Sequence, residues 1–141
     1  MIAYLDSSVV LRILLRQPHA LREWNRIELG VASVLVQVEC LRTLDRLRLR
    51  AGLADEVIAR RREAVFRVME HVELVDVNTA ILDRVAQSFA TELGTLDAVH
   101  LASALLWREA TGQDLVMATH DQALAIAARS MGLQVIGVSS S

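Results

Sequence analysis

The residues best suited to chemistry in this sequence are four carboxylates, Asp6, Glu39, Asp97 and Asp121. The first and the last come after short apolar runs that are typical of buried strands, and the middle two lie near the starts of predicted helices. In a parallel α/β sheet, the ends of the strands and the N-termini of the helices that follow them share one edge. The four carboxylates can therefore meet at that edge.

Carboxylates that converge repel one another unless cations hold them together. An all-oxygen set of ligands, without cysteine or paired histidine, suits Mg²⁺ or Mn²⁺ rather than Zn²⁺. Ions of this kind activate water and neutralise charge on a phosphodiester during in-line hydrolysis. The four acids therefore predict a Mg²⁺ or Mn²⁺ site that hydrolyses phosphodiester bonds.

Each acid also has an ordinary structural explanation when it is considered alone. Asp6 or a neighbouring serine can cap the helix that follows it. Asp97 lies in the first turn of a predicted helix, where the helix dipole stabilises a carboxylate. Glu39 stands among apolar neighbours and can pair with Arg42 three residues on. His100 follows Asp97 by one turn and is by itself an ordinary helix residue rather than a metal ligand.

The basic residues are unevenly distributed, and all fifteen are arginine. Residues 1–70 hold twelve arginines against nine acids, whereas residues 71–141 hold three against eight. Arg46 and Arg50 lie seven and eleven residues beyond Glu39, and at ~100° per residue they stay within about 20° of its direction on a helix. This stripe is either a track for phosphates that approach an acidic site or a solvated helix face.

Composition predicts a single domain, 1–141, with a core of Leu, Val, Ile and Ala, since 53% of the residues are hydrophobic and only 4% are aromatic. No apolar stretch approaches the ~18 residues of a membrane span, and no secretory signal pattern is present. The lone Cys40 suits a reducing cytoplasm and is expected to be a small buried side chain. We therefore expect a cytoplasmic protein without a membrane partner.

Strands and helices are predicted to alternate along the chain. Strands are expected at 2–6, 31–33, 72–75, 115–119 and 133–138. Helices are expected at 9–15, from Pro18 towards Glu28 with Gly30 as its end, from a Ser33 cap to about Arg50, at 54–70, at 81–93 between an Asn78 cap and Gly94, from a Thr95 cap to about Ala110, and after Asp121 to Met131. This order predicts a three-layer α/β/α fold around a mainly parallel sheet of four or five strands. Ser139 to Ser141 are expected to fray.

Four motifs carry a family resemblance that extends over about Ile2 to Val138. They are Tyr4-Leu5-Asp6-Ser7-Ser8-Val9, the Glu39 that ends Ser33-Val34-Leu35-Val36-Gln37-Val38-Glu39, Leu96-Asp97-Ala98-Val99-His100-Leu101-Ala102, and Thr119-His120-Asp121. In this order and spacing the chain resembles the PIN-domain nucleases. By its size it looks like a VapC-type toxin of a type II toxin–antitoxin pair.

The resemblance implies a role for each matching residue. Asp6, Glu39, Asp97 and Asp121 would form the metal-binding and catalytic quartet, with Ser8 and Thr119 as supporting polar residues. It also implies an RNA substrate, a cognate antitoxin that covers the site and, together with the high apolar content, a homodimer. Many relatives carry a basic residue just before the third acid, where this chain has Gly94-Thr95, so a local phosphate contact is in doubt.

Three other classes of protein compete with this interpretation. A phosphoacceptor receiver domain normally depends on a lysine, and this chain has none. A haloacid-dehalogenase-like phosphatase would have Asp-x-Asp after its first strand, and here the third residue is Ser8. A PIN-like protein that only binds RNA or a partner keeps the fold without catalysis. Metal-dependent cleavage of RNA separates the enzyme from the binding protein.

Overall fold

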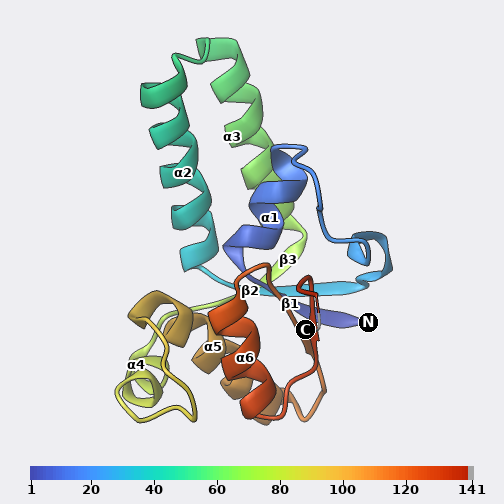
Figure 1. Ribbon diagram of the computed structural model, residues 1–141, viewed down its shortest axis with the longest axis vertical. Coiled ribbons are helices and arrows are strands. Elements are labelled where there is room, and N and C mark those ends of the chain that lie inside the picture. Colours follow the sequence, from blue (N-terminus) through green and yellow to red (C-terminus); the bar gives the residue numbers. More distant parts are fainter. Residues whose placement is uncertain (140–141) are drawn as a thin grey trace.

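A parallel sheet forms the centre of the molecule in the computed structural model, which describes residues 1–139. Within those residues, five strands are arranged in the order β3-β2-β1-β4-β5, and every neighbouring pair is parallel (Figure 1). The strands are β1 (Ile2–Leu5), β2 (Leu29–Ser33), β3 (Val72–Val75), β4 (Val116–Ala118) and β5 (Val135–Ile136). The predicted α/β fold is confirmed, and the sheet is wholly rather than mainly parallel.

The middle strand, β1, is apolar because it is covered on both faces. Ala3, Tyr4 and Leu5 are all buried, as expected for a strand inside a parallel sheet. β1 pairs with β2 on one side and with β4 on the other. The chain builds the sheet outwards first towards β3 and then towards β5, so the order reverses between β1 and β4. In open α/β sheets, ligands bind at this switch point, beyond the carboxyl ends of the strands.

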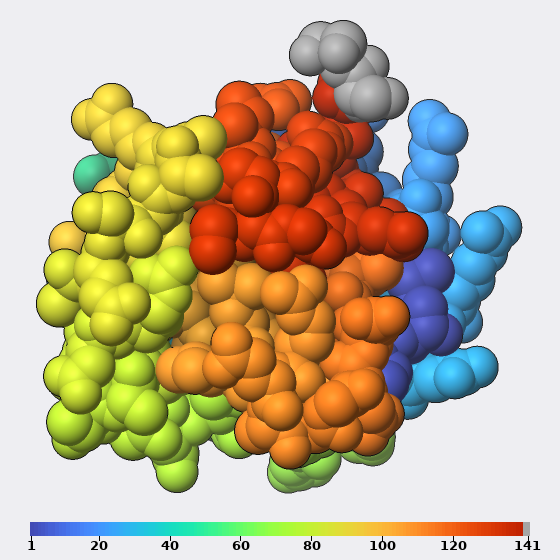
Figure 2. All heavy atoms as spheres, turned by 90° about the horizontal axis from the view of Figure 1, so that it is seen from below, coloured from blue at the N-terminus to red at the C-terminus, as the bar shows by residue number. Residues whose placement is uncertain are grey.

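Helices cover both faces of the sheet. One face carries α1 (Ser7–Leu14), α2 (Leu35–Ala51) and α3 (Asp55–Glu70), and α2 and α3 form a hairpin that extends beyond the sheet (Figure 1). The other face carries α4 (Thr79–Val85), α5 (Thr95–Thr111) and α6 (Gln122–Ser130). Seen from that side, the surface runs from the yellow-green of α4 to the red of α6 (Figure 2). The predicted three layers are therefore present.

Side chains of β1 alternate between the two layers and join two cores. Ala3 and Leu5 pack in the cluster that contains Val9, Val36 and other residues of α1, α2 and α3. Tyr4 packs in the opposite cluster, with residues of α5 and α6. This alternation follows from the two-residue period of a strand. Cys40 is a buried free thiol, as predicted, and burial, followed by the charges of nearby acids, raises its pKa to about 12.

The helix predicted from Pro18 towards Glu28 is wrong. This segment contains only the short 3₁₀ turn η1 (Trp24–Arg26), and the chain enters it through His19, whose φ is 60°. Gly30 does not end a helix but lies inside β2. A Cβ atom on Gly30 would lie 2.9 Å from Cδ1 of Leu5. The glycine is therefore explained by close packing between neighbouring strands.

Two further helix boundaries differ from the prediction. α4 ends at Val85 and not near position 93. Just beyond this end, the Arg84 guanidinium donates to the Ser88 carbonyl and lies 4.3 Å from the Phe89 ring centroid. Asn78 caps α4 as expected, with Oδ1 accepting from an amide 3.0 Å away. Gly94, not Thr95, occupies the N-cap position of α5, so the cap predicted at Thr95 is wrong.

The last strand is also shorter than predicted, with only Val135 and Ile136 in β5. Residues 140 and 141, part of the predicted domain and of the segment expected to fray, lie outside the described residues. In the described part of the chain, no helix has both the length and the apolar character that crossing a membrane requires.

Candidate functional site

Asp6 lies at the centre of the candidate site, directly after β1 and only 4% exposed. It occupies the N-cap position of α1, yet its carboxylate makes no capping hydrogen bond within the described residues. Its Oδ2 instead accepts hydrogen bonds from Ser8 Oγ at 2.7 Å and from Thr119 Oγ1 at 2.9 Å. Capping does not explain this buried carboxylate, which is held by hydroxyl groups from two separate segments.

The two hydroxyl groups also connect Asp6 to the loop after β4. Ser8 Oγ accepts from the His120 amide at 3.0 Å, and Thr119 Oγ1 accepts from the Asp121 amide at 3.0 Å. Each hydroxyl thus donates its proton to Asp6 and accepts from the β4–α6 loop. The two predicted supporting residues therefore fix the orientation of Asp6 and tie the ends of β1 and β4 together.

Glu39, on α2, reaches the same edge of the sheet and contacts His100. Glu39 Oε1 lies 2.6 Å from His100 Nε2, and Oε2 accepts a hydrogen bond from Ser7 Oγ at 3.3 Å. The expected partner of Glu39 was Arg42, but in the described residues the charged partner is His100. His100 Nε2 also lies 3.7 Å from Asp6 Oδ1. His100 therefore stands between two of the predicted acids.

The hydrogen bonds around Tyr4 determine which nitrogen of His100 carries the proton. The Tyr4 hydroxyl accepts from the Ser33 amide at 3.1 Å and lies 2.8 Å from His100 Nδ1. Its single proton is then free to be donated to Nδ1, which leaves Nε2 as the protonated nitrogen that donates to Glu39. A buried chain of hydrogen bonds thus runs from β2 through β1 and α5 to the carboxylate of Glu39.

The sequence did not identify His100 or Tyr4 as functional residues. The available signal was the spacing of His100 and Asp97, three residues apart on one face of a helix. Burial tends to lower the pKa of His100, but its hydrogen bond to Glu39 and the charges of Asp6, Glu39 and Asp97 raise it overall. His100 is therefore held by the acids that surround it.

Asp97 and Asp121 complete the set from α5 and α6. Asp97 lies in the first turn of α5, as predicted. Burial, followed by the negative charges of Asp121 and Asp6, raises the pKa of Asp97 to about 6, with a smaller contribution from Glu39. Asp121 caps α6, with Oδ1 accepting from the Leu124 amide at 3.0 Å. The four acids therefore share one electrostatic environment, although Asp121 also has an ordinary capping role.

The site fits a cation by its charge and donor chemistry. Buried and half-buried carboxylates that raise the pKa of a neighbour are stabilised by a positive ion, and carboxylate oxygens suit Mg²⁺ and Mn²⁺. Among residues 1–139, however, no three His, Cys, Asp or Glu side chains are already arranged to coordinate one ion. Glu39 is turned onto His100. The charges are therefore in place, but the coordination shell is not formed.

The two arginines predicted to contact RNA lie on α2, beyond Glu39. Both Arg46 and Arg50 are exposed. Arg46 Nη2 donates to Thr43 Oγ1 at 3.1 Å, within the same helix. Their stripe follows the α2–α3 hairpin away from the acids, and their contact with RNA remains a prediction.

Comparison with known proteins identifies the family. Residues 3–129 match the model of the PIN domain. The chain is 34% identical over 140 residues to ribonuclease VapC46 of Mycobacterium tuberculosis, an alignment that covers 96% of this chain and 97% of that protein.

Two solved structures have the same fold at low sequence identity. The toxin–antitoxin complex from Klebsiella pneumoniae matches with a TM-score of 0.65 at 14% identity, over 99% of this chain and 97% of that one. VapBC2 from Rickettsia felis, bound to a DNA fragment from its promoter, matches with a TM-score of 0.66 at 11% identity, over 96% and 97%. With the four motifs, the family model and the VapC relative in agreement, the chain belongs to the PIN-domain family and, within it, to the VapC ribonucleases.

Proposed function

We propose that the protein is a Mg²⁺- or Mn²⁺-dependent endoribonuclease, the toxin of a toxin–antitoxin pair, and that the chain acts as one PIN-like nuclease domain. The observation that carries the proposal is the buried Asp6, held by Ser8 and Thr119 at the switch point of the sheet. A buried carboxylate beside three other acids is costly unless it serves a cation. Such a site suits hydrolysis of a phosphodiester bond.

Asp6, Glu39, Asp97 and Asp121 would hold the cation, which when bound supplies activated water and offsets charge on the scissile phosphate. Ser8 and Thr119 keep the Asp6 carboxylate pointed towards the site. His100 donates its Nε2 proton to Glu39 and so fixes the position of this carboxylate. Burial and the charges of Asp121 and Asp6 raise the pKa of Asp97 to about 6, and a bound cation would oppose that shift.

One observation favours an alternative, a PIN-like protein that binds RNA or a partner without catalysis. The 2.6 Å bond between Glu39 and His100 occupies a carboxylate that a cation needs. The two proposals differ in whether Glu39 leaves His100 when Mg²⁺ or Mn²⁺ is added. Cleavage of RNA decides between them.

The proposed partners are RNA, a cognate antitoxin and a second copy of the chain in a homodimer. The antitoxin is supported by the two structural relatives, which are described as a toxin–antitoxin complex and as VapBC2. The homodimer is supported by isologous pairing as the default for soluble oligomers. A mass measurement in solution at micromolar concentration tests it.

The proposed function is tested with purified protein and single-stranded RNA in Mg²⁺, in Mn²⁺ and in excess EDTA. We expect cleavage with either metal ion, no cleavage in EDTA, and no cleavage by Asp6→Asn under any condition. Undiminished cleavage by the wild type in EDTA would contradict the proposal. Sequencing the cut ends of cellular RNA after induction of the wild type and of Asp6→Asn would then identify the substrate.

A further inference from the structure

A polar cavity of about 530 Å³ adjoins the acid site. Its walls include Arg12 on α1, His19 and Arg22 in the following loop, and His120 and Gln122 beside Asp121. We infer that this cavity binds a backbone phosphate of the RNA, next to the one that is cleaved. The inference rests on the proposed ribonuclease function and assigns the residues that hold the neighbouring nucleotide.

The charge of the cavity suits an anion. Arg12 and Arg22 carry permanent positive charges there, and Glu23 is the one acid in the lining within the described residues. The guanidinium group presents a planar fork of N–H donors that matches a phosphate. The adjoining site consists of acids, so the cavity places positive charge beside a negative centre.

The cavity wall is fixed in a strained conformation. His19 has φ of 60° and Arg16 has φ of 51°, which place two non-glycine residues in the left-handed region. Two bonds from the end of α1 hold this loop, since Arg12 Nη1 donates to the His19 carbonyl at 3.3 Å and the Gln17 amide donates to the Arg12 carbonyl at 2.9 Å. Strain of this kind persists where the surroundings enforce it, often at ligand sites.

His120 supplies an unpaired polar atom in the same wall. Its Nδ1 lies 2.6 Å from the Gly137 carbonyl, which can only accept, so Nδ1 carries the ring proton. Its Nε2 is buried and has no hydrogen-bond partner among residues 1–139. Buried polar atoms are nearly always paired in folded proteins, and an exception calls for a missing partner. In the neutral ring this Nε2 is an acceptor and does not pair with a phosphate oxygen, so Arg12 and Arg22 supply the contacts that the inference uses.

Two hydrogen bonds connect the cavity to Asp6. The His120 amide donates to Ser8 Oγ at 3.0 Å, and Ser8 Oγ donates to Asp6 Oδ2 at 2.7 Å. Gln122, in the cavity wall, directly follows the predicted metal ligand Asp121. A phosphate in the cavity would therefore lie beside the cleaved one, and would position the strand across the acids.

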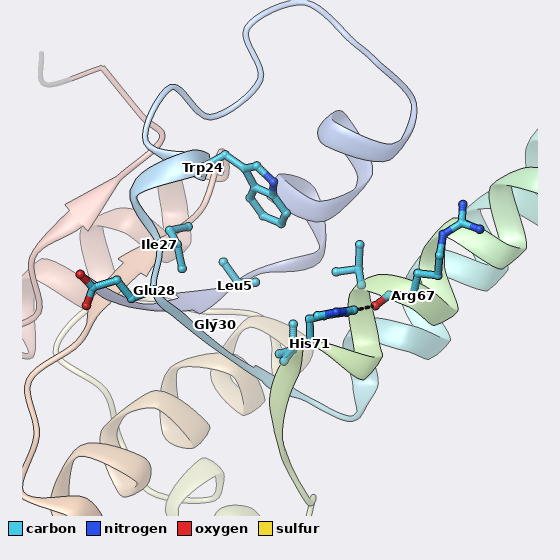
Figure 3. A pocket seen from close by; sticks show the side chains of 9 residues that line it. Leu5, Trp24, Ile27, Glu28, Gly30, Arg67 and His71 are labelled. Atoms are coloured by element: carbon cyan, nitrogen blue, oxygen red, sulfur yellow. Dashed lines mark hydrogen bonds between the residues drawn. The ribbon is translucent and has the colours of Figure 1, made fainter.

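Another cavity of the described residues has different chemistry. It has a volume of about 470 Å³ and is lined chiefly by apolar side chains, among them Leu5, Trp24 and Ile27 (Figure 3). The charged groups of Glu28 and Arg67 point away from it in the same view. It suits an apolar group and not a phosphate, so it does not carry the inference.

The test compares Arg22→Gln with Arg26→Gln in the full-length protein. Both arginines are exposed and four residues apart, but only Arg22 lines the cavity. Binding of a fluorescein-labelled single-stranded RNA of mixed sequence is measured in EDTA, so that cleavage does not interfere, over a range of salt concentrations. Melting curves check that both variants are folded.

We expect Arg22→Gln to weaken RNA binding about tenfold at low salt and to reduce the slope of log K against log salt by about 0.7, the value for one phosphate contact on a single strand. Arg26→Gln should bind as the wild type does. Equal effects of the two substitutions, on affinity and on slope, would overturn the inference.

Two further arms separate this inference from its rivals. In the first, poly-glutamate competes with the labelled RNA for the protein. If Arg22→Gln weakens this competition but leaves RNA binding unchanged, the cavity receives an acidic protein segment and the inference is overturned. Cleavage by the wild type in Mn²⁺ is measured independently. If the wild type cleaves RNA normally and Arg22→Gln binds RNA as well as the wild type does, the phosphate site is rejected but the ribonuclease function is not. If the wild type does not cleave RNA and Arg22→Gln clearly weakens binding, the ribonuclease function is rejected but the phosphate site is not.

Discussion

The hydroxyl of Tyr4 is a single atom on which several elements depend. It accepts from the Ser33 amide and donates to His100, which in turn holds Glu39. All of these groups except Glu39 are fully buried. Removing the hydroxyl would leave an amide and an imidazole nitrogen without partners.

We therefore expect Tyr4→Phe to lower the free energy of unfolding by about 1–3 kcal/mol, the cost of leaving buried polar groups unsatisfied. It should also lower kcat for RNA cleavage while leaving KM unchanged, because Glu39 loses its fixed position. Urea unfolding and steady-state kinetics measure both. Ser130→Ala is the control, since its hydroxyl donates to the carbonyl three residues before it, away from Tyr4. Equal losses in the two variants would reduce Tyr4 to a packing role.

Asp97 gives the site a pH dependence with a definite sign. Its folded-state pKa of about 6 exceeds the ordinary value of 3.8. Between these values the folded protein binds more protons than the unfolded chain, so stability falls as the pH rises. The raised pKa of His100 acts in the same direction, since its contribution is present at low pH and is lost as the pH rises through its folded-state value.

In EDTA, the free energy of unfolding of Asp97→Asn should depend less on pH than that of the wild type. Compared with the wild type, the variant should therefore become more stable as the pH rises from about 4 to above 6. Mn²⁺ at a hundred times its Kd should stabilise the wild type by about 2.7 kcal/mol and the variant much less. Urea unfolding at several pH values, with EDTA and with Mn²⁺, measures both effects. A variant less stable than the wild type at pH 7.5 in EDTA, with no effect of Mn²⁺ on either protein, would leave Asp97 with only its helix-dipole role.

At the scale of elements, the sequence predicted those strands and helices that depend on local signals. The strands at 2–6, 72–75 and 115–119 are short apolar runs between turns, and the structure has strands there. The helix predicted after Pro18 was wrong because the two signals used for it are ambiguous. A proline that can start a helix can also lie in a loop, and a glycine that can end a helix can also lie in a strand. Gly30 is in fact required by Leu5, a contact between strands that no local pattern contains.

The α2–α3 hairpin is the element to which the RNA-binding prediction belongs. Arg46→Gln with Arg50→Gln should weaken RNA binding and lower the salt slope by about 1.4 if each arginine contacts one phosphate of a single strand. The control removes two exposed arginines from the other helix of the hairpin, Arg60 and Arg67. Anisotropy titrations in EDTA measure the affinities of the wild type and of the two double variants. Equal slopes for the two double variants would identify the α2 stripe as a solvated face.

At the scale of the whole molecule, the parallel topology explains why four distant acids could be predicted together. In any parallel α/β fold, the ends of the strands and the starts of the following helices lie at one edge of the sheet. The positions of the acids along the chain were therefore enough to predict that they lie near one another. The positions of His100 and of the polar cavity could not be predicted, because they depend on how α5 and the loop after α1 pack across that edge. The coordination shell also could not be predicted, since it depends on which way Glu39 turns.

Asp6 directly follows the central strand of the sheet, the kind of element that we expect to open last. Its amide donates to the Ala118 carbonyl at 3.0 Å, and the strand that carries it has a neighbour on both sides. Local opening in proteins begins at frayed ends, edge strands and projecting hairpins, while central strands separate only when the whole domain unfolds. Mutations can therefore accumulate in the hairpin, in the loop after α1 and at the outer strands with little disturbance of Asp6. Such an arrangement lets the surfaces that meet different RNAs and partners diverge around an unchanging centre.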